Sequence, residues 1–594
     1  PIFHLKDTSF LFSFTRAEED LQAVVNAVTL SGPLQQNVSA PTRNTELSMR
    51  ASRQLSPAQT AYVEYQYQNQ SNINEGVGEL VLEAAGSNVT NIESDFVFHD
   101  DYTLSPTRLN QLSALVEINR QDITNTNQGS KIVVQGAFVG GSAQAQQVKS
   151  EYNLRLTDTF SYTRGRHQMK FGVNLPHIGR RVLEDQSLFG GEYVFPSLAA
   201  YQANRPSTYE SQQGQSRYIY HDLEAGVFVL DVIQATPTLT ITPGLRYDWN
   251  NFTRSLANFS PRFSVAKLLD KDGATVLRAG AGVYYDRAGN TPLADVKRYS
   301  QPSLFDTLVT DSPCFPVICP DQITLQSPNV VRLAPDIRTP LRFNLSVSLE
   351  HRVGKAATAS VAYYKANSFN AYRSVDVNAP IPFSGSTVRP DPAFGRYRQI
   401  ESAGNVRSNS LTLMLRGRIG SVFSGTVQYV YAHAIDNTGG IGFYPQNQYL
   451  PDNEEASSNY DARHRFNMFG TFGQGKPLNL GVQVHISNGT PYTITTGTDP
   501  YGTGFFNARP AGVARNSKNN PMYQELDLRY GYDFKMRPKK LDKSPTIGFS
   551  LSAFNVLNRL NPAIVSSVVT SPTFGQVNAA YPPRRMQLEL RYTF

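Results

Sequence analysis

Apolar and polar residues alternate along most of this chain, and this period restricts its fold more than any other feature. Between Thr238 and Trp249, every second residue is apolar or aromatic, and the residues between them are polar, charged or glycine. Successive side chains of a β-strand point to opposite faces, so a segment of this kind forms a strand with one apolar face. About twenty segments follow the pattern, and none has the period of a convincing amphipathic helix. The sequence therefore predicts an all-β fold.

The lengths of the segments and of their connections favour a membrane barrel over a soluble sandwich or propeller. Many segments are far longer than the ~5–6 residues that are average for strands of globular domains. Connections alternate between short and long, as in transmembrane β-barrels, which have short periplasmic turns and long extracellular loops. The short ones lie near Lys535–Ser544, Gly473–Pro477, Ile419–Phe423, Val353–Lys355, Asp270–Gly273, Gln234–Pro237 and Thr163–Arg166. The long ones lie near Leu557–Pro582, Ser487–Pro521, Ala434–Ala462, Lys365–Ser408, Arg287–Leu341 and Arg180–Ser216, and Asn250–Asn258 alone is short on the long side.

These patterns predict a single domain over residues 1–594, an antiparallel transmembrane β-barrel of about 20–22 strands in the bacterial outer membrane. Lipid leaves no backbone hydrogen bond open, so the sheet must close and its apolar face must point outward. The last segment, Arg585–Phe594, alternates up to a terminal aromatic residue. We expect Leu588 to face lipid and Phe594 to lie at the periplasmic rim.

Composition excludes several other classes of protein. Charged residues make up 17% of the chain, below the roughly 25% of an average soluble protein. No run approaches the ~18 apolar residues of a membrane-spanning helix. The net charge of +7 is not gathered into a basic patch, so no nucleic-acid partner is expected. HExxH and GxSxG motifs are absent from the sequence, so we expect no enzyme and assign no catalytic, cofactor-binding or metal-binding residue.

The polar parity of the strands carries charges of both signs, which would line the lumen. Two interpretations remain open: a hydrated wall, or a surface complementary to a polar plug domain, which barrels of about 22 strands usually contain. Among the histidines, His464 is expected on the lipid-facing rim and His485 in the lumen. The lumen-facing or plug-facing candidates are Arg246, Asp248, Arg278, Asp286, Arg463, Arg465 and Arg529.

The long loops carry the candidates for ligand recognition. Aromatic side chains there could stack against sugars or aromatic ligands, or could only pack the loops together; these candidates are Phe443, Tyr444, Tyr449, Tyr501, Phe505 and Phe506. An acidic cluster consists of Asp452, Glu454, Glu455 and Asp461. Its spacing is not that of an EF-hand calcium loop, so a solvated loop is the favoured interpretation.

The two cysteines, Cys314 and Cys319, lie in one predicted extracellular loop between Pro313 and Pro320. Four residues separate them, and a turn at Phe315 would bring their Cα atoms within ~7 Å, close enough for a disulfide. The oxidising periplasm would let the bond form. The alternatives are a free thiol pair or a metal site, but two thiolates are too few for a closed zinc site. We therefore expect a disulfide that stiffens the loop tip.

Several segments resemble TonB-dependent receptors of the Oar-like type, which usually carry a carboxypeptidase-regulatory-like domain. The terminal strand resembles the C-terminal signal of outer-membrane barrels. The more specific segments, which follow one another in the family's order, are Thr242–Asp248, Ser260–Phe263, Arg278–Arg287, Tyr460–Phe466, Phe506–Pro510 and Phe554–Arg559.

This resemblance implies a receptor that imports a bulky nutrient, such as a glycan, a peptide or a metal chelate. The implied partners are outer-membrane lipid, an extracellular ligand, the chain's own plug domain and the TonB–ExbB–ExbD energising complex. Lys6–Phe14 resembles an early barrel strand, so we expect the plug, the TonB box and the first one or two strands to precede this sequence. The alternative function is a structural or adhesive surface protein whose long loops bind other cells.

Overall fold

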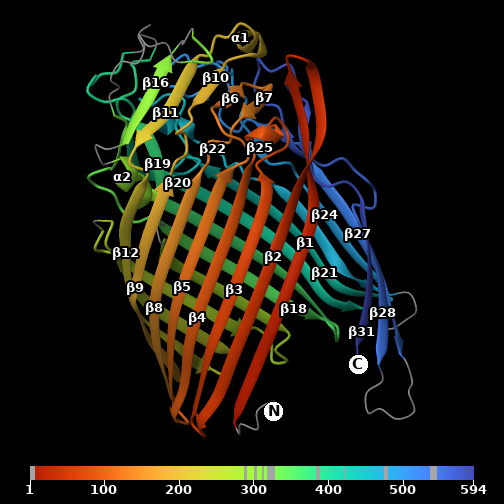
Figure 1. Cartoon of the computed structure of the whole chain (residues 1–594). Helices are drawn as coiled ribbons and strands as arrows, with labels where there is room; N and C mark the ends of the chain where they lie inside the picture. Colours follow the sequence, from red (N-terminus) through yellow and green to blue (C-terminus); the bar gives the residue numbers. More distant parts are fainter. Residues whose placement is uncertain are drawn as a thin grey trace.

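The computed structural model of the chain describes residues 7–253, 255–286, 291–299, 304–310, 314–317, 328–382, 388–420, 422–473, 479–535 and 545–593. Its barrel strands belong to one 22-stranded sheet, which curls into a barrel (Figure 1). Without the short loop strands β17 (Val330–Leu333) and β22 (Ala456–Ser457), 20 strands remain, each antiparallel to the next. They are β1 (Thr8–Thr29), β2 (Gly32–Ser56), β3 (Gln59–Glu75), β4 (Ser87–Ser105), β5 (Arg108–Asn125), β8 (Gln147–Arg164), β9 (His167–Asp185), β12 (Arg217–Thr236), β13 (Leu239–Asn250), β14 (Phe259–Leu268), β15 (Thr275–Tyr285), β18 (Leu341–Val353), β19 (Ala357–Asp376), β20 (Tyr397–Ile419), β21 (Phe423–Asp436), β23 (His464–Phe472), β24 (Leu480–Ser487), β27 (Tyr523–Lys535), β28 (Thr546–Phe554) and β31 (Arg585–Thr593).

The register places the alternating apolar residues of neighbouring strands side by side on the outer face. Leu588 on β31 lies opposite Leu551 on β28, and Leu590 lies opposite Phe549. Glu589, the next residue, pairs with Arg529 on the lumen side, so Leu588 points to the opposite, outer face. The predicted fold class and the outward face of the terminal strand are therefore confirmed.

Strand β1 begins and strand β31 ends at the same end of the barrel, the lower end in Figure 1. The short turns join strands at this end, and the long loops gather at the other end, which we call the mouth. The expected segregation of loop lengths is therefore present, and the short 251–258 loop is its predicted exception. A second exception, which the sequence pattern did not indicate, is the two-residue turn between β1 and β2. Phe594 lies outside the described residues.

Two long loops are shorter than the sequence indicated. The predicted loop Lys365–Ser408 is wrong because β19 and β20 stay paired as far as Asp376 opposite Arg398, which leaves a loop of residues 377–396. The predicted loop Arg180–Ser216 is wrong at its start, since β9 continues to Asp185. The reason is the same in both cases. Apolar alternation ends where lipid contact ends, but backbone pairing continues, and side chains such as Leu183, Tyr372 and Val375 are then buried by the loops.

The loops at the mouth contain further secondary structure that the period did not reveal. Five strands from three separate loops form a second sheet in the order β16-β11-β10-β6-β7. Its core contains Val134, Phe138, Tyr193, Phe195 and Tyr209. The bounds are β6 (Lys131–Val134), β7 (Phe138–Gly141), β10 (Glu192–Phe195), β11 (Thr208–Gly214) and β16 (Leu304–Thr310).

The remaining elements are short. The α-helices were not expected from the sequence. The helix α2 carries charged side chains, among them Lys297 and Arg298 in its last turn. In the described residues, no helix is long and apolar enough to cross a membrane. The sheet's two edge strands are β1 and β31, and no pairing between them occurs within the described ranges. The helices are α1 (Leu198–Gln202), α2 (Thr291–Tyr299), η1 (Glu83–Ala85) and η3 (Pro451–Glu454); the other strands are β25 (Pro491–Tyr492), β26 (Lys518–Asn519), β29 (Pro562–Val565) and β30 (Val577–Ala580).

Candidate functional site

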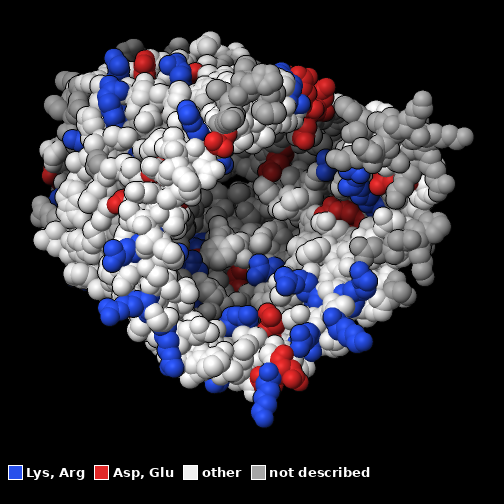
Figure 2. Space-filling view, turned by 90° about the horizontal axis from the view of Figure 1, so that it is seen from below, with Lys and Arg blue, Asp and Glu red and all other residues white. Residues whose placement is uncertain are grey.

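The barrel encloses a hollow lumen, seen from the end of the short turns in Figure 2, with basic and acidic residues around it. These charges come from the polar parity of the strands. Several predicted lumen residues lie in ion pairs: Arg246 with Asp248 at 2.6 Å, Arg278 with Glu350 at 3.5 Å, and Arg529 with Glu589 at 2.8 Å. Charges of both signs therefore compensate one another along the wall.

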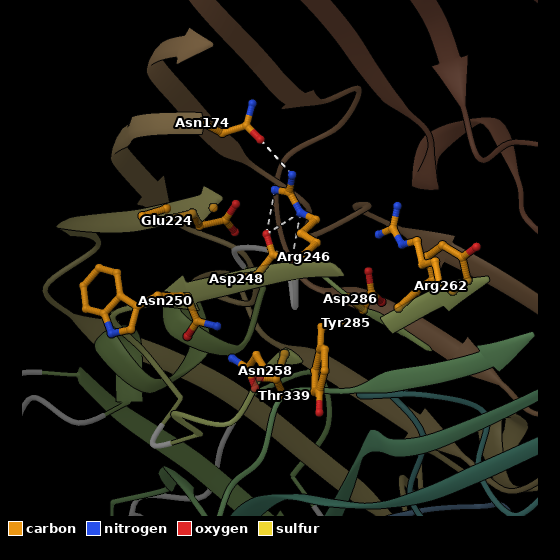
Figure 3. A pocket seen from close by; sticks show the side chains of 14 residues that line it. Asn174, Glu224, Arg246, Asp248, Asn250, Asn258, Arg262, Tyr285, Asp286 and Thr339 are labelled. Atoms are coloured by element: carbon orange, nitrogen blue, oxygen red, sulfur yellow. Dashed lines mark hydrogen bonds and ion pairs between the residues drawn. The ribbon is translucent and has the colours of Figure 1, made fainter. Parts of the chain in front are cut away.

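A cavity of about 330 Å³ lies in this wall, between β9, β12, β13, β14 and β15 (Figure 3). Arg246 is held on one side of it, because its guanidinium donates to both oxygens of Asp248 and, at 2.9 Å, to the Asn174 Oδ1. Gly226 makes this arrangement possible, since a Cβ there would overlap the Arg246 guanidinium. Asp286 also lines this cavity, so the structure brings three of the predicted lumen residues together.

The other predicted lumen residues lie elsewhere on the wall. Arg463 is 3.5 Å from Asp461, above the start of β23. Arg465 points into the lumen from β23, and its buried Nε has no hydrogen-bond partner in the described part of the chain. His485 faces Asn467 across β23 and β24 with its Nδ1 2.5 Å from the amide oxygen. His464 shares the outer face with Phe466, as the alternation indicated, and contacts the Tyr429 hydroxyl.

At the mouth, one buried carboxylate joins two of the long loops. Glu454, at the end of η3 in loop 437–463, is 1% exposed. Its two carboxylate oxygens accept hydrogen bonds from Arg509 at 2.7 and 3.1 Å, and one also accepts from the Gln446 N–H. Arg515 donates to the Glu454 carbonyl oxygen at 3.0 Å and to the Asp436 carboxylate. We call Glu454, Arg509, Arg515 and Asp436 the loop clasp.

The interpretation of the acidic cluster as a solvated loop is wrong for Glu454 and Asp461, which are buried. Asp461 lies 3.5 Å from Arg463 and contacts the His433 ring. Asp452 and Glu455 are exposed, as expected, and pair with Arg373 and Arg407. The sequence could not indicate this burial because the partners lie up to 79 positions away along the chain. Among the described residues, no group of side chains is arranged to hold a metal ion.

Next to the loop clasp, two of the six predicted ligand-contacting aromatics form a stack. The rings of Tyr444 and Phe505 are 4.2 Å apart between centroids and nearly parallel. The Arg396 guanidinium lies 4.5 Å from the Phe505 ring centre, and the Arg398 guanidinium lies 5.9 Å from that of Tyr444. Burial raises the pKa of the Tyr444 hydroxyl to about 12, although the neighbouring arginines act to lower it, so this phenol stays neutral at ordinary pH.

The other predicted aromatics have different neighbours. Phe443 lies under the Arg515 guanidinium, and the Tyr449 hydroxyl donates to the Ala379 carbonyl oxygen in the neighbouring loop. Tyr501 and Phe506 are half-buried in loop 488–522. The sequence interpretation missed Arg396 and Arg398, which flank the stack, and Arg509 and Arg515, which belong to the loop clasp. The one available signal was Arg509, which belongs to the family-like segment Phe506–Pro510.

The loop with the cysteines docks on the five-stranded sheet. Phe315 packs edge-on against Tyr193 and Phe195, at centroid distances of 4.9 and 5.1 Å. The Tyr193 hydroxyl donates to the Pro316 carbonyl oxygen at 2.9 Å. Cys314 takes part in a disulfide, and no described cysteine is free. Cys319, its predicted partner, lies outside the described residues, so the pairing stays a prediction.

Thiol labelling checks the predicted Cys314–Cys319 pair. We expect a maleimide to add to neither cysteine of the folded, unreduced protein, and to both after reduction, because a disulfide has no thiolate to react. Mass spectrometry of the labelled protein counts the additions. Two additions before any reductant would contradict the bridge.

Comparisons with known proteins agree with this architecture. The model of the family described as "Outer membrane beta barrel domain" matches residues 17–255 and 250–521. Among solved structures, the outer membrane transporter YddB from Escherichia coli is similar with a TM-score of 0.68 and 13% identity, over 99% of this chain and 73% of that one. A mutant of the ferric enterobactin receptor PfeA from Pseudomonas aeruginosa is similar with a TM-score of 0.64 and 14% identity, over 99% of this chain and 75% of that one. The FrpB iron transporter from Neisseria meningitidis is similar with a TM-score of 0.56 and 12% identity, over 99% of this chain and 77% of that one. No curated protein sequence matches the chain.

Proposed function

The chain belongs to the outer membrane beta barrel domain family, and from this membership we propose that it is the barrel of a TonB-dependent receptor that imports a bulky nutrient. The observation that carries the proposal is a wide polar lumen beneath a mouth covered by interlocked loops. Similar solved structures are titled as transporters and receptors.

In this proposal the mouth selects the ligand. The Tyr444–Phe505 stack offers aromatic surface in this region, and the flanking Arg396 and Arg398 are already in ion pairs with Glu210 and Asp295. Aromatic rings of this kind suit planar parts of a ligand, since they stack on flat rings. The loop clasp holds this region in place from both loops.

The lumen charges have a second role in the proposal. The ion-paired wall, which includes Arg246, Asp248, Arg278 and Arg529, suits contact with a polar plug domain. The plug would connect the barrel to the TonB–ExbB–ExbD complex, whose energy would open a path for the ligand. This part of the proposal extends the sequence resemblance, and the complete gene is its direct check.

An uptake assay tests the proposed function. Cells that produce the full-length protein are given labelled ferric enterobactin, a labelled oligosaccharide and a labelled peptide, with TonB present or deleted. We expect accumulation of at least one probe, and its loss without TonB. We expect Phe505→Ala to lower that uptake about fivefold or more, because removing a stacked ring forfeits roughly 1 kcal/mol.

The matched control is Tyr460→Ala, since Tyr460 is also a loop aromatic but is 57% exposed and outside the stack. It should leave uptake unchanged. If no probe accumulates while the cells gain adhesion to other cells or matrix, the adhesive alternative replaces the proposed function. If both variants lower uptake equally, the stack has no selective role.

A further inference from the structure

Two lumen arginines, Arg262 and Arg342, each lie over an aromatic ring, as Arg246 does over Phe228. The Arg262 guanidinium on β14 lies 4.4 Å from the ring centre of Tyr284 on β15. The Arg342 guanidinium on β18 lies 5.9 Å from the ring centre of Tyr364 on β19. In the sheet Arg262 is opposite Gly282, and Tyr284 is opposite Arg342. On the lumen face, arginine and tyrosine therefore alternate over four successive strands: Arg262 on β14, Tyr284 on β15, Arg342 on β18 and Tyr364 on β19.

Neither arginine has an acidic partner. Across the described ranges, no carboxylate lies within ion-pair distance of Arg262 or Arg342, in contrast to Arg246, Arg278 and Arg529. In Figure 3 the dashed lines join Arg246 to Asp248 and Asn174, and none reaches Arg262. A guanidinium over an aromatic face is attracted by the ring quadrupole and keeps its donor edge free.

The backbone is adapted to this pair. A Cβ on Gly282 would lie 3.1 Å from the Tyr284 ring and 3.2 Å from the Arg262 Cγ, tighter than ordinary packing. Glycine at this position therefore leaves room for the guanidinium to lie against the ring. Gly282 and Tyr284 both belong to the family-like segment Arg278–Arg287, so the sequence already contained the residues that make the arrangement possible.

Arg262 also lines the lumen cavity described above, where it is the cation without a partner. The cavity of about 330 Å³ is lined by Arg262 and Arg246 and by three carboxylates, those of Glu224, Asp248 and Asp286. The three carboxylates disfavour a polyanion through like-charge repulsion. They favour a ligand that combines one anionic group with hydrogen-bond donors.

We propose that Arg262, oriented by Tyr284, binds a carboxylate of the transported ligand in the lumen wall. The planar guanidinium fork matches a carboxylate in two parallel hydrogen bonds, and an arginine that is already oriented loses little entropy on binding. This inference rests on the proposed function, because it assumes that the ligand enters the lumen. The carboxylate could belong to a peptide terminus or to an acidic sugar.

Trp249 provides a local reporter for a binding test. It is the chain's only tryptophan, and it lines the same cavity. The purified chain in detergent is titrated with acetyl-Ala-Ala, with the same dipeptide as its C-terminal amide, and with glucuronic acid. Tryptophan fluorescence and isothermal titration calorimetry are both recorded, so that the Kd does not depend on the reporter alone.

We expect saturable binding of at least one acid and none of the amide. Arg262→Gln should raise the Kd of that acid about ten- to hundredfold, because a hydrogen-bonded charge pair is lost. The Kd of Arg262→Lys for that acid should lie between the Kd of the unmodified protein and that of Arg262→Gln. The control is Arg591→Gln, a lumen arginine on β31 that lies 3.7 Å from Asp533, and it should leave the Kd unchanged. Gel mobility of the unheated protein verifies that each variant is folded.

The probes and the uptake assay separate the possible outcomes. Binding of the dipeptide acid assigns the carboxylate to a peptide, and binding of glucuronic acid assigns it to a sugar. Equal binding of acid and amide, an unchanged Kd in Arg262→Gln, or no binding of either acid overturns the inference. TonB-dependent uptake that persists in any of these cases leaves the proposed function standing. If TonB-dependent uptake is absent while the acid still binds, the proposed function is contradicted and the carboxylate-binding site at Arg262 stands.

Discussion

Replacing Glu454 by Gln is expected to separate the two loops of the loop clasp while the barrel stays folded. The substitution removes the negative charge that faces Arg509 and Arg515, whose side chains are only 6% and 5% exposed. Removing one partner of a buried ion pair typically costs about 3–5 kcal/mol, because here Arg509 stays buried without a compensating charge, whereas Arg515 keeps Asp436. This change lowers the free energy needed to open the mouth loops locally, since the clasp lies outside the membrane strands.

Limited proteolysis measures this opening. Loop 488–522 contains Arg515, whose side chain is buried in the loop clasp, so trypsin can cleave after it only when the loop opens. When opening is fast compared with cleavage, the rate follows the open population. We therefore expect cleavage of Glu454→Gln to be faster than that of the unmodified protein by on the order of a hundredfold or more.

The adjacent residue offers a matched control. Glu455 is in an ion pair with Arg407, but both side chains are more than half exposed. Exposed pairs contribute about 0–1 kcal/mol, so Glu455→Gln should change the cleavage rate little. Equal rates for the two variants would show that the clasp does not hold the loops together.

Replacing Leu588 by Arg is the second large expected effect, and it concerns the barrel itself. Leu588 lies near the middle of β31, on the outer face and opposite Leu551. A charged side chain on the lipid face costs about 2–4 kcal/mol at the bilayer midplane. The free energy of unfolding in lipid vesicles, measured by urea titration with gel mobility as the readout, should fall by this amount.

The control for Leu588→Arg is Gln587→Arg, which places the same charge one residue away. Gln587 is opposite Ser552, on the lumen face, where water can solvate the new guanidinium. We expect the free energy of unfolding to change by much less than for Leu588→Arg. If Gln587→Arg destabilises the protein as much as Leu588→Arg does, the two faces of the strand have been assigned the wrong way round.

The strands were predictable because their signal is local and repeated. Each membrane strand alternates between lipid and lumen, so the sequence of Thr238–Trp249 or of Arg585–Phe594 already states which residues face outward. The alternation of short and long loops also indicated which end of the barrel is periplasmic and which is extracellular. The position of Leu588 on the outer face and that of Arg246 and Asp248 on the lumen wall follow from parity alone.

The mouth was not predictable in this way, because its contacts join residues that are far apart in the sequence. Ion pairs link Glu454 to Arg509, and ring contacts link Tyr444 to Phe505, from different loops. Of the acidic residues that the sequence interpretation left solvated, Glu454 and Asp461 are buried by partners that lie elsewhere along the chain or in other loops. The five-stranded sheet likewise needs three loops to meet, and no single loop carries a period that reveals it.

The sequence by itself determined the kind of fold, the faces of the strands and the end of the barrel at which the loops gather. Lipid and water impose these features on every strand separately, so each strand carries its own record of them. Only the tertiary structure decided that Arg262 stacks on Tyr284 and that Glu454 is buried. Those outcomes depend on the register between strands and on the packing between loops, where the environment of a side chain is supplied by distant residues rather than by its neighbours along the chain.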